Sequence, residues 1–405
     1  MREFNTTAVC VPSKHYMVDI TERVKEIKKL VDAGKYFVIN RARQYGKTTT
    51  LTALGKVLVP EYYVVSMDFQ DYGEDSFRDE DSFCRDFSMD FCALLEEQIS
   101  TENAELSQAI HNLMDLAGDT AKAIRLFTMF QCLRQIWAKA DRPMVLMIDE
   151  VDSATNNQLF LDFLAALRSH YIKREKSASY KAFQSVILAG VRDVKHLKSK
   201  IRDEQTSKEN SPWNIAADFM IDMSFSRDDI KGMLAEYEAD HHTGMDTEQI
   251  AGMIYDYTAG YPFLVSRICQ LTDVKVTQTM SPVEAWTRKG IDEAIKLILA
   301  ESNTLFESLT KNLNNYPELN TAIRSILMEG EKIAWNTQQD AIVQMQMYGL
   351  IRNDHNTVRI ANRIFEMMLY NLFLSDEELS TLSRSSMARA TIISRHRPET
   401  RPARM

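Results

Sequence analysis

The sequence predicts an α/β fold in which helices cover both faces of a parallel sheet, followed by a helical region and a smaller mixed region. Short runs of strand-forming residues alternate with helical stretches over the first half of the chain, which is typical of βαβ units. One of these runs, Met144 to Ile148, is continuously apolar, as expected for a strand buried on both faces. After Ser226 the strand-like runs give way to helical patterns.

The composition limits the class of protein. The chain has 405 residues, of which 45% are hydrophobic, and this suits two or three packed domains. Its formal net charge of −9 disfavours indiscriminate nucleic-acid binding but leaves a local basic face open. The five cysteines form no C-x-x-C pair, which predicts reduced thiols and no zinc site. Without a signal-peptide pattern or an apolar run of about 18 residues, we expect a cytoplasmic protein with no membrane partner.

The first predicted elements flank a short loop. An amphipathic helix is expected to begin near Thr21 and to end at Gly34. Tyr36 to Ile39 is a short strand-like run. A second helix is predicted from Lys47, and Glu61 to Asp68 reads as the next strand.

The remaining elements of the α/β region alternate in the same way. Residues 81–140 show a helical pattern and lead into the apolar strand that ends at Ile148. A helix is predicted over 157–173, and a strand follows over Ser185 to Ala189. Residues 219–225 are interpreted as a fifth strand. These units predict a three-layer sandwich.

The second half of the chain divides further. Ser226 followed by Asp229 forms a capping-box pattern, and helices are predicted from there to about residue 300. Three helical stretches and two strand-like runs, 349–352 and 357–360, then indicate a winged helix. The last residues lack periodicity and predict a disordered tail. The predicted domains are an α/β core (1–225), a helical lid (226–302), a winged helix (303–375) and the tail (376–405).

The loop segment INRARQYGKTTTL, from Ile39 to Leu51, carries the residues that bind phosphate groups. Gly46 lets the backbone approach an oxygen, Lys47 reaches the phosphates, and the Thr48 hydroxyl holds Mg²⁺. The N-terminus of the following helix also favours anions. Arg41 replaces the usual first glycine, which is tolerable if the backbone there avoids positive φ. We therefore expect ATP and Mg²⁺ to be bound by Arg43, Gln44, Tyr45, Gly46, Lys47, Thr48 and Thr49.

Two further strand ends supply candidate catalytic groups. Asp149 is expected to hold Mg²⁺ and Glu150 to polarise the attacking water, although a solvated pair at a strand's end is the alternative. Arg192 follows the next strand, where ligands of parallel sheets bind, and is placed to sense a γ-phosphate. The alternative for Arg192 is a surface pair with Asp193 or Asp152.

These motifs together resemble a family. RARQYGKTTT between a strand and a helix, MVLMIDEVD, LAGVR, the AGYP turn and the winged helix resemble a bacterial AAA-like ATPase of the STAND class, over Phe4 to Ser375. Its members are P-loop NTPases that use nucleotide state as a switch. They also share an R-x-R-x-F/Y-G-K loop, so the resemblance implies that Arg41 is a family feature.

The resemblance also implies roles for single residues. Lys47 would bind the phosphates, while Thr48 and Asp149 would hold Mg²⁺. Glu150 and Arg192 would be catalytic. Pro262 of the AGYP turn matches a proline that packs on adenine, although Gly-x-Pro is more often a simple helix break.

The resemblance leaves the partners open. No arginine finger acting in trans is matched, and a homo-oligomer stays open. Relatives often continue into a PD-(D/E)XK nuclease-like domain. We expect this chain to lack that domain, because no such pattern follows Leu374.

Two functions from different classes follow. The first is a nucleotide-controlled switch with slow hydrolysis, and a chain that binds ATP without hydrolysing it is a variant of this. The second is a nucleic-acid-binding regulator with a structural ATP site. The candidate recognition helix, 336–348, has no Lys or Arg, and Arg352, Arg359 and Arg363 are few for binding phosphates. We therefore expect the winged helix to act as a regulatory lid.

Overall fold

A parallel four-stranded sheet forms the centre of the first half of the chain. The computed structural model describes residues 2–99, 103–191 and 213–395. The strands are β3 (Phe37–Asn40), β4 (Tyr63–Asp68), β5 (Met144–Asp149) and β6 (Ser185–Gly190), in the order β3-β6-β5-β4. All their pairings are parallel, which confirms the predicted α/β class.

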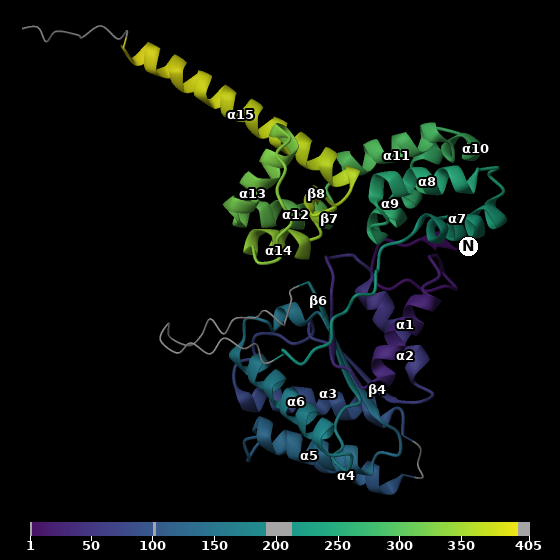
Figure 1. The fold of residues 1–405 in the computed structure, drawn as a ribbon, viewed down its shortest axis with the longest axis vertical. Coiled ribbons are helices and arrows are strands. Elements are labelled where there is room, and N and C mark those ends of the chain that lie inside the picture. The colour runs from purple at the N-terminus through teal and green to yellow at the C-terminus, as the bar shows by residue number, and fades with distance from the viewer. Residues whose placement is uncertain (1, 100–102, 192–212, 396–405) are drawn as a thin grey trace, which may run out of the picture.

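Helices cover both faces of this sheet (Figure 1). On β5, Val145 and Met147 belong to the apolar cluster under α1 and α2, whereas Leu146 and Ile148 belong to the cluster on the opposite face. This alternation explains why the strand is apolar throughout. The covering helices are α1 (Thr21–Asp32) and α2 (Lys47–Leu58) on one face, and α3 (Glu80–Glu96), α4 (Ala104–Gly118), α5 (Leu126–Lys139) and α6 (Gln158–Lys176) on the other.

The strand order brings together the loops that follow β3, β5 and β6, at the carboxyl ends of the strands. The chain leaves β3, crosses to β4 at the far side, and returns through β5 to β6, which lies between β3 and β5. Since all four strands are parallel, the carboxyl ends of β3, β5 and β6 are neighbours. In open α/β sheets, ligands bind at such a point.

The predicted fifth strand, Phe219 to Phe225, is wrong. The neighbouring Ala217 makes a single parallel bridge with Phe37, and the segment continues without strand structure. Its Phe219 ring stacks on that of Phe37, with centroids 5.9 Å apart. Side-chain packing thus holds this segment along the sheet edge, and the apolar run that suggested a strand serves that packing.

A helical module follows the sheet. The capping box of Ser226 and Asp229 opens its first helix, as predicted. Two short strands from the start of the chain, β1 (Glu3–Phe4) and β2 (His15–Tyr16), pack against it. We define the helical module as α7 (Arg227–His241), α8 (Thr247–Thr258), α9 (Pro262–Val274), α10 (Pro282–Ala285) and α11 (Arg288–Ala300), with a short 3-10 turn, η3 (Val276–Gln278).

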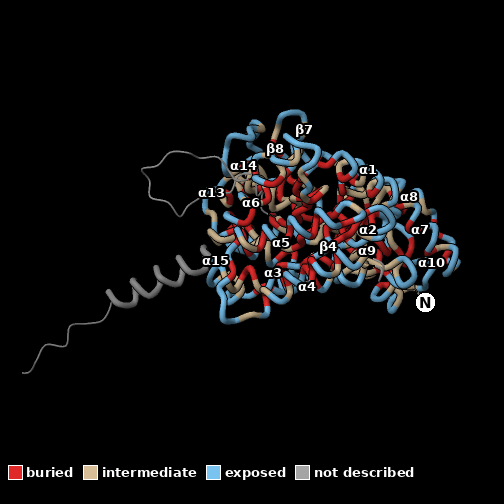
Figure 2. Tube along the Cα trace, turned by 90° about the horizontal axis from the view of Figure 1, so that it is seen from below, coloured by how far each residue is buried: buried red, intermediate tan, exposed pale blue. Residues whose placement is uncertain are grey.

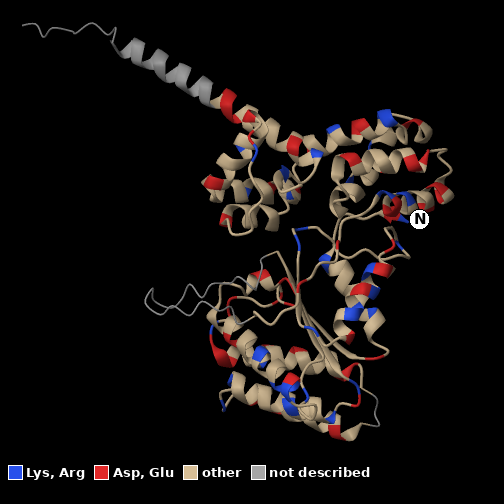
Figure 3. Ribbon diagram, viewed as in Figure 1, with Lys and Arg blue, Asp and Glu red and all other residues tan. Residues whose placement is uncertain are grey.

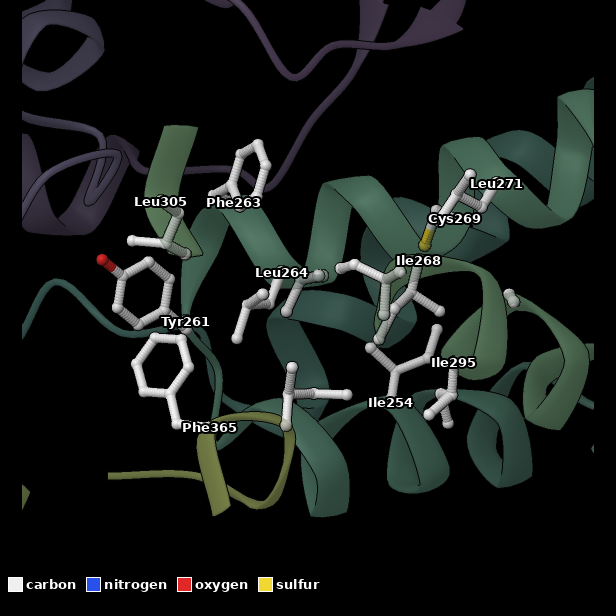
Figure 4. Close-up of a cluster of buried hydrophobic side chains, with 14 of the residues drawn as sticks. Ile254, Tyr261, Phe263, Leu264, Ile268, Cys269, Leu271, Ile295, Leu305 and Phe365 are labelled. Atoms are coloured by element: carbon white, nitrogen blue, oxygen red, sulfur yellow. The ribbon is translucent and has the colours of Figure 1, made fainter. Parts of the chain in front are cut away.

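A C-terminal module completes the fold. Three α-helices precede an antiparallel hairpin, as expected, and a fourth follows it. The module shares one apolar cluster with the helical module. Figure 4 shows Leu305 and Phe365 of this module beside Tyr261 at the start of α9. We define the C-terminal module as α12 (Thr304–Asn315), α13 (Pro317–Arg324), the π-turn η4 (Ser325–Glu329), α14 (Asp340–Met347), β7 (Ile351–Asp354), β8 (Thr357–Ile360) and α15 (Arg363–Arg395).

The prediction of a disordered tail from residue 376 is wrong for residues 376–395, because α15 continues to Arg395. The first part of this helix is anchored by buried Phe365, Leu369 and Phe373. No Gly or Pro interrupts the sequence up to Arg395, so a helix that is already nucleated can propagate. Figure 2 shows the buried residues inside the body of the molecule. Figure 1 shows α15 projecting from this body. Residues 396–405 lie outside the described part.

Within the described parts of the chain, no helix is both long and apolar enough to cross a membrane.

Candidate active site

The loop between β3 and α2 places a glycine at the helix N-terminus. Gly46 has a φ of 77°, and a Cβ added to it would meet no atom within 4 Å. Gln44 is the other left-handed residue of the loop, with a φ of 57°. Arg41 is not among the residues with positive φ, which confirms that a non-glycine can stand at that position.

Arg41 ties the loop to the segment along the sheet edge. Its guanidinium donates to the carbonyl of Asn40 at 2.9 Å and to that of Ile221 at 2.8 Å. It also lies over the Phe219 ring, 5.2 Å from the centroid. Burial lowers the pKa of this guanidinium. The side chain thus replaces the missing strand pairing with hydrogen bonds of its own.

Substitution of this arginine tests its role. We expect Arg41→Gly to destabilise the chain by about 1–3 kcal/mol, because hydrogen bonds from a charged group are lost and glycine adds backbone freedom. ATP binding should not improve. Urea unfolding and ATP titration measure the two effects, and Arg41→Lys should lose part of the stability because it lacks the fork geometry. If Arg41→Gly is as stable as the wild type and binds ATP more tightly, Arg41 is a defect of the loop and not a structural tie.

Lys47 lies inside the loop. It is 6% exposed, and its Nζ donates to the carbonyls of Arg41 and Ala42, at 3.1 Å each. Burial lowers the pKa of Lys47, while the nearby Glu150 opposes this shift. The amine is therefore held where the backbone curves around the N-terminus of α2.

Thr48 and Asp149 meet at the same point. The exposed Thr48 donates its hydroxyl to Oδ2 of the buried Asp149 at 2.6 Å. Glu150 follows with a left-handed φ of 50°, and its N–H donates to Oδ1 of Asp149 at 2.9 Å. Burial raises the pKa of Glu150. A hydroxyl and carboxylates are the oxygen donors that Mg²⁺ prefers, so the residues present fit this ion.

The other loop residues contact distant parts of the chain. Gln44 donates through Nε2 to the Thr304 hydroxyl at 3.0 Å. The Tyr45 hydroxyl lies 2.7 Å from that of Ser224, and the Thr49 hydroxyl accepts from the Cys10 N–H at 3.2 Å. The Arg43 side chain is exposed. Of the predicted loop residues, Gln44, Tyr45 and Thr49 thus contact segments that are distant in the sequence.

A cavity of about 370 Å³ adjoins the loop at Gly46 and Thr49. Pro262, predicted to lie near a base, lines it together with Phe263. Residues 5–8, 10, 17, 18 and 20 also line it, and sequence reasoning missed them. No motif marks these residues, and the two-residue strands beside them are too short to give a periodic signal.

A carboxylate from the 3-10 turn after β5, η1 (Val151–Ser153), lies against the end of β6. Oδ2 of Asp152 accepts from the Val191 N–H at 2.6 Å, and a Cβ added to Gly190 would stand 3.2 Å from either carboxylate oxygen. The sequence suggested Asp152 only as an alternative partner of Arg192. Arg192 itself lies outside the described residues.

The chain is similar to known proteins over most of its length. A model of the AAA-like domain family matches residues 4–375. A Walker-type ATPase of Pyrococcus abyssi, PABY2304, is similar in structure, with 13% identity, a TM-score of 0.56, and coverage of 91% of this chain and 99% of that chain.

Two further solved structures are less similar. The ADP form of the ORC2 protein of Aeropyrum pernix has 11% identity and a TM-score of 0.42, covering 92% of this chain and 97% of that one. Cdc6p of Pyrobaculum aerophilum has 12% identity and a TM-score of 0.40, with the same coverages. No curated protein matches the chain. At such identities the likeness concerns the fold alone. The family model, in contrast, spans residues 4–375, and the chain therefore belongs to the AAA-like domain family.

Proposed function

We propose that this chain is an ATP-dependent molecular switch of the STAND class, which binds ATP with Mg²⁺ and hydrolyses it slowly. The observation that carries the proposal is the contact of the phosphate-binding loop with both following modules. A ligand shifts a conformational equilibrium only through different affinities for the two states. A loop that touches the nucleotide on one side and the modules on the other provides such a difference.

Consecutive loop residues make these contacts. The Arg43 carbonyl accepts from the hydroxyl of Tyr261, at the start of the helical module. Gln44 bonds to Thr304, the first residue of α12. Gly349 lies so close to Ala42 that a Cβ added to this glycine would stand 2.8 Å from the Ala42 Cβ. A shift of the loop therefore disturbs the packing of both modules.

The site residues fit the chemistry of ATP hydrolysis. Lys47 would exchange its bonds to loop carbonyls for bonds to phosphate oxygens, which are stronger because both partners are charged. Thr48 and Asp149 would hold Mg²⁺, which supplies charge neutralisation at the phosphates. Glu150 would accept a proton from water, and its raised pKa suits a general base. Pro262 and the adjoining cavity would take the base.

Limited proteolysis tests the switch. Ser226 and Ser302 are exposed at the starts of the helical and C-terminal modules, respectively. We expect ATP with Mg²⁺ to change the rate of subtilisin cleavage near both residues, because nucleotide alters the packing of the modules. Mass spectrometry locates the cuts, and Lys47→Ala should show no nucleotide effect. Nucleotide binding with identical cleavage at both junctions would contradict the switch.

The alternative, a nucleic-acid-binding regulator, has weaker support. Arg359 lies 3.6 Å from Asp354, and Arg363 lies over the Tyr257 ring, so two of the three predicted cations are engaged within the protein. The helix α14 contains no Lys or Arg. Figure 3 shows basic residues scattered among acidic ones along the ribbon of the described chain. We therefore propose that the C-terminal module, a winged helix in our interpretation, acts as a lid.

A further inference from the structure

A second cavity, of about 560 Å³, lies where the three parts of the chain meet. Arg41 and Asp222 line it from the α/β region, Tyr255 from the helical module, and Arg352 and Asn362 from the C-terminal module. It shares only Tyr45 with the lining of the cavity beside Gly46. The two cavities are therefore separate sites on either side of the loop.

Asn362 brings a buried, unpartnered donor to this second cavity. The residue is 5% exposed, and its Oδ1 accepts from the Phe365 N–H at 2.9 Å, which caps the N-terminus of α15. This bond fixes the orientation of the amide, because a flip would place a donor against a donor. The Nδ2 group has no hydrogen-bond partner among the described residues. Buried donors are rarely left unpaired. Because Asn362 lines the cavity, a rotation of its neighbours would let this amide donate to an acceptor there.

The charges around Asn362 indicate an anionic acceptor. Arg352 is exposed on β7, and its side chain makes no ion pair or hydrogen bond within the described chain. Arg41 contributes a second guanidinium, and the N-terminus of α15 adds its dipole. Asp222 is the one carboxylate in the lining, and its Oδ1 accepts from the Ser224 N–H at 2.9 Å. The charged side chains that line the cavity, two arginines and one aspartate, therefore give it a net positive charge.

We propose that this cavity binds a small organic anion, whose carboxylate or phosphate group accepts from Asn362 and pairs with Arg352. Phe219, Tyr255 and Met220, which is 86% exposed, offer an apolar surface for the rest of such a molecule. A ligand here contacts all three parts of the chain at once. It therefore favours the docked arrangement of the modules and acts as an effector distinct from the nucleotide.

Calorimetric titration with inorganic phosphate and with citrate tests the proposal. The titrations use the full chain carrying Lys47→Ala, so that the phosphate-binding loop does not compete. We expect at least one anion to bind. Asn362→Asp keeps the helix cap but replaces the donor with a carboxylate oxygen, and it should weaken binding about tenfold or more. Arg352→Gln should do the same. Tighter binding of phosphate indicates a phosphate-bearing effector, and tighter binding of citrate a carboxylate.

Arg359→Gln is the matched control. Arg359 pairs in register with Arg352 in the same hairpin, carries the same charge, and is not in the cavity lining. Arg359→Gln should leave the affinity for phosphate and for citrate unchanged. The proposal is overturned if neither anion binds, if Asn362→Asp and Arg352→Gln bind normally, or if Arg359→Gln weakens binding equally. Circular dichroism shows whether Asn362→Asp keeps its helices, and the exposed Arg352 gives an independent variant if it does not.

Discussion

Lys47→Ala should strongly weaken ATP binding, and Glu150→Gln should strongly slow turnover while binding persists. The Lys47 amine is buried at the N-terminus of α2, against the loop carbonyls of Arg41 and Ala42. We expect affinity to fall roughly a hundredfold or more, because each hydrogen bond between charged groups is worth about 1.5–3 kcal/mol. Glu150→Gln keeps the shape of the side chain but removes the basic oxygen, and turnover should fall ~10²–10⁴-fold.

Binding of ATP and release of phosphate measure the two effects separately. Lys56→Ala is the control for the first variant, because Lys56 is an exposed lysine on the same helix. Glu74→Gln is the control for the second, since Glu74 is exposed in the loop after β4. Both controls should behave as the wild type. Equal ATP affinity in Lys47→Ala and wild type would exclude the loop as the nucleotide site. Full turnover in Glu150→Gln would show that another group acts as the general base.

The sequence allowed prediction of the elements that carry local patterns. The strand ending at Asp149 was recognisable because both of its faces are buried, and the start of α2 at Lys47 because a glycine precedes it. The positions of Lys47, Thr48, Asp149 and Glu150 followed from these elements, and the structure brings the four residues together. Local signals were sufficient here since each residue lies at the end of a regular element.

Contacts between distant segments could not be predicted in this way. Arg41 bonds to Ile221, and Cys10 to Thr49, across stretches of chain that share no pattern. The run over 219–225 has the composition of a strand but is held by ring stacking. The segment after residue 375 has the composition of a tail, yet it extends an anchored helix. In both errors, tertiary packing outweighed composition.

Gly260→Ala should strongly destabilise the chain. Gly260 has a φ of 73° and follows Ala259, which is also left-handed. A Cβ at this position would stand 2.0 Å from the carbonyl oxygen of Phe225, whose N–H donates to the Gly260 carbonyl at 2.8 Å. We expect a loss of at least about 3 kcal/mol, since left-handed backbone alone costs alanine about 1–2 kcal/mol and the backbone clash adds to it.

The effect should also reach the active site. Gly260 sets the direction of Tyr261, whose hydroxyl bonds to the Arg43 carbonyl, and of Pro262 in the cavity beside the loop. ATP binding by Gly260→Ala should therefore weaken even at temperatures where the variant stays folded. Gly252→Ala is the matched control, because Gly252 lies inside α8 with no atom within 4 Å of an added Cβ. That variant should gain about 0.5–1 kcal/mol. If urea unfolding gives the two variants equal stability, the AGYP turn is a simple helix break and not the joint that positions the helical module on the loop.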